Sequence, residues 1–145
     1  MKVSVEFSTP LFPLLCLSRR EARDIARRIL EALGCTDCAI TLVITNDFRM
    51  QHLNITFLSC PGPTNVLAFE EDSPGEEKFL GEVFINAQAV KRESALYGQP
   101  LFEHFIRILA HGIQHLAGFE HGQDMEDWTL HLQHTISAEE YGLEA

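Results

Sequence analysis

Residues 101–117 form the segment that most constrains how this chain can fold. At about 100° per residue, its apolar side chains fall on one stripe of a helix, which must therefore pack against a core. The stripe consists of Leu101, Phe105, Ile108, Leu109, Gly112 and Leu116. Inside a helix, glycine costs roughly 1 kcal/mol relative to alanine. We therefore expect another backbone, that of a strand, to approach this helix closely at Gly112.

The same helix carries histidines at the edge of the apolar stripe. His111 and His115 are four residues apart, so they project from one face and can bind one metal ion. Gly118 can adopt the left-handed conformation that ends a helix, and the chain reversal could bring His121 to the same metal. Three imidazoles leave a fourth tetrahedral position open, as in catalytic zinc sites. We predict one zinc ion per chain, bound by His111, His115 and His121, with no fourth protein ligand.

His104 lies seven residues before His111 and on the same helix face. Two interpretations are open for it. It could support the metal ligands from behind, or it could be an ordinary histidine at the rim of the core. We favour the rim position.

The periodicity of the rest of the chain predicts an α+β fold. A strand over residues 3–7, a helix over 18–33 that begins with the Ser18–Glu21 capping box, and an apolar strand over 39–44 predict a parallel strand–helix–strand unit. A helix over 47–57 and an antiparallel pair of strands over 64–70 and 80–86 follow. Further helices are predicted over 87–97, 101–117 and 125–137. The result is a small mixed sheet of about four strands with about five helices, and a metal site at the end of a central helix, as in zincins.

Length and composition set further limits. The 145 residues suit one domain, which we place over residues 1–145. No apolar run approaches the roughly 18 residues of a membrane span, and the first residues do not resemble a signal peptide. We therefore expect a cytoplasmic protein with no membrane partner and mostly reduced cysteines.

Cys35 and Cys38 have the C-x-x-C spacing of redox and metal-binding pairs. A redox pair should lie at a helix N-terminus, where the thiolate is stabilised. This pair instead follows the end of a helix and leads into a strand. We interpret both residues as buried or incidental thiols.

The formal net charge of −10 repels nucleic acid on average, so RNA contacts must come from local basic patches. The strongest candidate lies on the helix over residues 18–33. It comprises Arg19, Arg20, Arg23, Arg27 and Arg28. Its more ordinary interpretation, which we favour, is a solvated outer helix face.

Three segments resemble the YbeY family of bacterial endoribonucleases. The family's hallmark, His-Gly-x-x-His-Leu-x-Gly-Tyr-Asp-His, is similar to residues 111–121, with Phe119 for Tyr and Glu120 for Asp. Residues 63–69, Pro-Thr-Asn-Val-Leu-Ala-Phe, resemble the family's Pro-Thr-Asp-Val-Leu-Ser-Phe. Residues 80–85 resemble its Leu-Gly-Asp-Ile-x-Ile strand.

The resemblance implies a zinc-dependent endoribonuclease specific for single strands. It further implies a role in rRNA maturation at the 16S 3′ end and in ribosome quality control. The implied partners are precursor rRNA and the ribosome or its small subunit. Zinc can lower the pKa of bound water to about 7 and polarise a phosphoryl oxygen. Whether this water or a ribose 2′-hydroxyl attacks the phosphorus is left open.

Two positions depart from the family at places where it has functional residues. A family arginine regarded as important for activity is replaced by Leu58, so Arg107, Lys91 or Arg92 would have to supply the missing charge. Asn65 replaces the family's Asp. Its amide can donate to a phosphate or a base, although it could also simply cap the strand. We expect RNA to approach between the histidine helix and the strand over 64–70.

Two other functions compete with this interpretation. The spacing of the histidines and Gly118 also matches metzincin peptidases, but Gly112 occupies the position of their general base and has no side chain. The second alternative is a zinc-binding ribosome-assembly or RNA-binding factor with weakened catalysis. The loss of the arginine at Leu58 and the acidic charge favour this second alternative, but we prefer the metal-dependent endoribonuclease to it.

Overall fold

The computed structural model describes residues 2–8, 17–58, 64–71, 78–118, 127 and 129–136. Within these ranges the chain forms an α+β fold. Its elements are β1 (Lys2–Phe7), α1 (Arg19–Ala32), β2 (Cys38–Thr45), α2 (Asp47–Leu58), β3 (Val66–Glu70), β4 (Lys78–Asn86), α3 (Ala87–Tyr97) and α4 (Leu101–Leu116). Residues 129–136 are also helical, inside the helix expected over 125–137. None of the described helices is long and apolar enough to cross a membrane.

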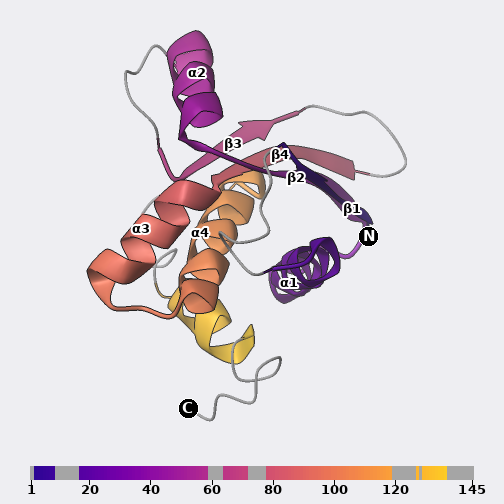
Figure 1. Cartoon of the computed structure of the whole chain (residues 1–145). Coiled ribbons are helices and arrows are strands. Elements are labelled where there is room, and N and C mark those ends of the chain that lie inside the picture. The colour runs from indigo at the N-terminus through magenta and orange to yellow at the C-terminus, as the bar shows by residue number, and fades with distance from the viewer. Residues whose placement is uncertain are drawn as a thin grey trace.

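The four strands form one mixed sheet in the order β1-β2-β4-β3. β1, β2 and β4 are parallel, and β3 pairs antiparallel with β4. Both the parallel strand–helix–strand unit and the antiparallel pair are therefore confirmed. Helices α1, α3 and α4 lie on one face of the sheet and α2 lies on the other (Figure 1).

Helix positions depend on caps that the local sequence encodes. Ser18 and Glu21 form the expected capping box at the start of α1. At the start of α3, the Asn86 side chain accepts hydrogen bonds from the amides of Gln88 and Ala89 at 3.1 and 3.2 Å. α3 ends at Gly98, whose φ of 65° is left-handed. That turn sends the chain directly into α4.

Helix α4 lies directly on strands β3 and β4 at Gly112. A Cβ atom added to Gly112 would lie 2.8 Å from Val83 Cγ1 and 2.9 Å from Val66 Cγ2. The expected strand neighbour is thus present. The atoms nearest to the added Cβ belong to the side chains of the two valines, which fill the space that it would need.

The first prediction tests this packing through Gly112→Ala. Overpacking a core typically lowers the free energy of unfolding by about 1–3 kcal/mol. Replacing glycine by alanine inside a helix raises it by roughly 1 kcal/mol. We therefore expect the free energy of unfolding, measured in urea, to fall by about 1 kcal/mol. The loss should shrink in a Val66→Ala background, which removes one of the two contacts. If Gly112→Ala matches the wild type in stability, the strands do not constrain the helix at this point.

Candidate functional site

A groove of about 870 Å³ lies between α4 and β3. One wall is formed by six residues of α4. The other wall is formed by residues 64–68 and Glu70, and Glu93 and Tyr97 of α3 lie at one end. The helix residues are His104, Arg107, Ile108, His111, Gly112 and His115. The groove lies where we expected RNA to approach, between the histidine helix and the strand over 64–70.

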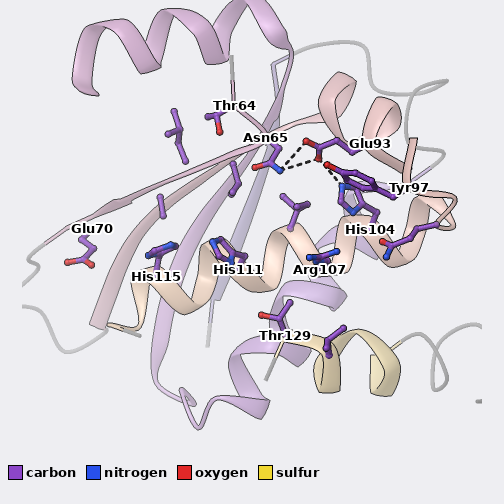
Figure 2. A pocket seen from close by; sticks show the side chains of 17 residues that line it. Thr64, Asn65, Glu70, Glu93, Tyr97, His104, Arg107, His111, His115 and Thr129 are labelled. Atoms are coloured by element: carbon purple, nitrogen blue, oxygen red, sulfur yellow. Dashed lines mark hydrogen bonds and ion pairs between the residues drawn. The ribbon is translucent and has the colours of Figure 1, made fainter. Parts of the chain in front are cut away.

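His111 and His115 lie side by side on the helix wall of the groove. Their ring centroids are 4.9 Å apart, and the ring planes meet at 78°. Both side chains are half-buried and rise from α4 toward β3 (Figure 2). Gly118 follows the helix with a φ of 90°, and its amide donates to the carbonyl of His115 at 3.1 Å. The expected left-handed end of the helix is therefore present.

His121, the third predicted ligand, lies outside the described residues. The part of the chain that the structure describes contains no cluster of three metal-binding side chains. The two histidines that are described do fit zinc in their chemistry. They are nitrogen donors one helical turn apart at the border between a packed core and an open groove.

Three side chains joined by hydrogen bonds lie at the other end of the groove. Asn65 Nδ2 donates to both carboxylate oxygens of Glu93, at 3.1 and 3.3 Å. Glu93 Oε1 also lies 2.9 Å from His104 Nε2 (Figure 2). The Asn65 amide is thus directed at Glu93, a contact that neither of the two roles considered for it, donation to RNA or capping of the strand, had included. No spacing signal singles out Glu93, because it lies on a different helix from His104, beyond the turn at Gly98.

The expected rim position of His104 was wrong. Its side chain is only 2% exposed and packs edge-on against Tyr97, with ring centroids 5.9 Å apart. The hydrogen bond between Nε2 and the Glu93 carboxylate offsets the cost of burying this imidazole. The buried Nδ1 has no hydrogen-bond partner among the described residues. His104 therefore belongs to the groove as a buried, oriented group.

Only one of the three candidate cations lines the groove. Arg107 is exposed on α4 between His104 and His111, and among the described residues it is the one lysine or arginine of the lining. Arg92 instead binds Asp47 through two hydrogen bonds of 2.6 and 2.9 Å, which lower the pKa of that carboxyl. Lys91 is exposed on α3 and is not in the lining.

The remaining sequence candidates lie away from the groove. Leu58 is the last residue of α2, on the opposite face of the sheet. The basic residues of α1 contribute nothing to the lining, and Arg19 stacks on the ring of Phe7 at 5.2 Å. α1 therefore does not supply the basic wall of this groove.

Cys38 of the C-x-x-C pair is a buried thiol and not a reactive thiolate. Cys38 is buried, and its Sγ donates to the carbonyl of Cys35 at 3.2 Å. Burial and the neighbouring Cys35 thiol raise the pKa of Cys38 to about 11. This agrees with the interpretation as buried or incidental thiols.

Comparison with known proteins gives a consistent set of relatives. The family model described as "Endoribonuclease YbeY" matches residues 16–141. The chain is 38% identical to Endoribonuclease YbeY of Oleidesulfovibrio alaskensis, over 78% of this chain and 79% of that protein. It is 34% identical to the protein of the same name from Nitratidesulfovibrio vulgaris, over 77% and 80%. The solution structure of TM1509 from Thermotoga maritima has a similar fold, with a TM-score of 0.64, 19% identity and coverage of 94% and 90%.

The second prediction concerns Asn65→Asp, which places two carboxylates against each other. A like charge raises the pKa of one of them in the folded state, so the folded protein takes up a proton that the unfolded chain does not. We expect the free energy of unfolding to fall by about 1–3 kcal/mol near pH 8, and this deficit to shrink toward about pH 5. Asn65→Ala is the control, because its smaller deficit should not change with pH. A deficit of Asn65→Asp that stays constant across this range would contradict the network.

Proposed function

The chain belongs to the YbeY family of endoribonucleases, and we propose that it is a zinc-dependent endoribonuclease that cleaves single-stranded RNA in the groove between β3 and α4. The observation that carries the proposal is the pair His111 and His115, one helical turn apart in a groove that also contains Arg107. We place this activity in rRNA maturation at the 16S 3′ end and in ribosome quality control. The precursor rRNA and the small ribosomal subunit would be its partners, in the cytoplasm.

His111, His115 and His121 would hold the zinc ion. When bound, zinc lowers the pKa of a water molecule and polarises a phosphoryl oxygen. The protein's own contribution is to fix the two described imidazoles on a helix that packs tightly at Gly112. Fixed ligands need no reorganisation when the substrate arrives, which favours catalysis.

Arg107 would stabilise the charge that develops on the phosphate. Phosphodiester cleavage concentrates negative charge on the non-bridging oxygens, and a guanidinium that is already in place stabilises that charge. Arg107 lies on the same wall as the histidines, one helical turn before His111. It can therefore take over the task of the family arginine that Leu58 replaces.

RNA is a better substrate for this groove than a peptide. A metallopeptidase of this histidine spacing needs a carboxylate beside the first histidine as general base. Gly112 occupies that position, and the space above its Cα is filled by Val83 and Val66. Among the described residues, Glu93 and Glu70 are the groove's carboxylates, and Glu93 is engaged with Asn65 and His104.

A zinc-binding ribosome-assembly or RNA-binding factor is the second candidate. Two observations favour it: Leu58 stands in place of the family arginine, and the net charge is −10. Such a protein would bind zinc and RNA in the same groove without efficient turnover.

The third prediction separates these two functions. The purified protein should cleave single-stranded rRNA fragments in a zinc-dependent manner and leave structured fragments intact. His115→Ala should abolish cleavage and zinc binding, and with them the zinc-dependent rise in stability, which is about 2.7 kcal/mol at a hundredfold excess over Kd. His52→Ala, an exposed histidine outside the groove, is the matched control. Zinc and RNA binding without cleavage would favour the assembly factor, and a melting temperature indifferent to zinc and chelator would contradict both.

The fourth prediction tests the cation. Arg107→Gln should lower turnover by about a hundredfold or more without changing zinc content, because it removes one stabilising donor. Lys91→Gln removes an exposed charge outside the groove and should leave turnover unchanged. In the Arg107→Gln background, Leu58→Arg should not restore turnover, because residue 58 lies at the end of α2, on the opposite face of the sheet from the groove. Full activity of Arg107→Gln would mean that another group supplies the charge.

A further inference from the structure

Strand β3 has an open edge in the described part of the sheet. It is the last strand in the order β1-β2-β4-β3, so only its β4 side is paired there. In an antiparallel pair, alternate residues exchange hydrogen bonds with the partner strand, and the residues between them direct their N–H and C=O groups outward. Asn86 N donates to the Asn65 carbonyl at 2.9 Å, and Glu71 N donates to the Leu80 carbonyl at 3.1 Å.

These two bonds show which residues of β3 bond to β4, because bonding and non-bonding residues alternate along the strand. Leu67 and Phe69 share the parity of residues 65 and 71, so their main-chain groups pair with β4. Val66, Ala68 and Glu70 have the opposite parity. Their N–H and C=O groups therefore point away from the sheet.

The residues that carry these outward groups line the groove. Residues 64–68 line it without a gap, and Glu70 lines it as well. Leu67 is among them although its side chain packs on the other face of the sheet with Met50 and Phe84. A groove that contacts consecutive residues, including one whose side chain points elsewhere, must touch the main chain of β3.

The opposite wall carries the chemistry of the site. β3 and α4 run alongside each other, with Glu70 near His115 at one end and Asn65 near His104 at the other (Figure 2). Arg107, His111 and His115 lie along the helix between these ends. A strand of RNA in the groove would therefore meet main-chain donors and acceptors on one side and the cation and histidines on the other.

We propose that the open edge of β3 binds the sugar–phosphate backbone of the RNA strand. The Ala68 N–H donates to a non-bridging phosphate oxygen, and the Val66 and Ala68 carbonyls accept hydrogen bonds from ribose 2′-hydroxyls. Arg107 on the facing wall favours a phosphodiester over a peptide strand as the occupant. Such contacts carry no base information and distinguish RNA from DNA through the 2′-hydroxyl. The inference rests on the proposed function and adds the groups that would hold the substrate.

Ala68→Pro tests the donor. Proline removes the outward N–H, which makes no bond to β4, and fixes φ in a range that strands at a sheet edge accept; edge positions whose N–H faces away from the sheet therefore tolerate proline. The affinity of zinc-loaded protein for a short fluorescein-labelled oligouridine, read as stopped-flow polarisation before cleavage, should weaken by about ten- to a hundredfold, the value of one hydrogen bond to a charged group. Ala68→Ser keeps the N–H and is the matched control, with both variants checked by thermal melting. Equal affinity of Ala68→Pro and wild type would overturn the assignment of the donor.

Amide hydrogen exchange in the wild type tests the same contact without a substitution and decides the matter if Ala68→Pro fails to fold. The Leu67 and Phe69 amides should be protected in the free protein, whereas the Ala68 amide should exchange fast and become protected at saturating oligodeoxyuridine. Wild-type affinity should also be higher for oligouridine than for oligodeoxyuridine, because only RNA supplies the 2′-hydroxyl. An Ala68 amide that stays unprotected would overturn the proposal even if the protein cleaves RNA. Protection without any cleavage would leave this binding mode intact and remove the nuclease function.

Discussion

The site depends on how closely α4 can approach the antiparallel strands β3 and β4. At Gly112 the helix has no side chain, and Val83 and Val66 fill the space that a Cβ atom would need. His111 and His115 lie directly before and three residues after this contact, so the same packing that brings the helix to the sheet also sets both imidazoles beside β3. Any side chain at position 112 would have to push the helix or the valines away, and the groove would change shape with them.

The far end of the groove is held by polar contacts instead of apolar packing. Asn65, Glu93 and His104 come from three different parts of the chain and are joined by hydrogen bonds of 2.9 to 3.3 Å. A carboxylate at position 65, as in the family motif that this segment resembles, would face Glu93. The amide of Asn65 removes that repulsion and donates to Glu93 instead. The substitution therefore changes the electrostatics of this end of the groove while leaving Glu93 able to orient His104.

Periodicity and caps were enough to predict most of the fold. The apolar run over residues 39–44 became the central strand β2, buried on both faces, and the Ser18–Glu21 box starts α1 as expected. The histidine spacing on one helix likewise predicted that His111 and His115 would share a wall of the groove. These predictions succeeded because each rests on residues within one element, whose relative positions the helix or strand geometry already determines.

The features that could not be predicted join elements far apart in the sequence. The burial of His104 depends on Glu93, eleven positions earlier and on another helix, and the use of the Asn65 amide depends on the same carboxylate. The choice among candidate cations likewise depended on tertiary partners, because Arg92 is held by Asp47 whereas Arg107 faces the groove. No local spacing contains this information.

The central claim is that the α4 wall of the groove holds a zinc ion where RNA can reach it. Anomalous diffraction at the zinc edge from crystals of the zinc-loaded protein tests this most directly. We expect one peak per chain in the groove, within coordination distance of a ring nitrogen of His111, His115 and His121, with no fourth protein ligand. A zinc peak elsewhere, or rings of His111 and His115 that bind different ions, would contradict the account.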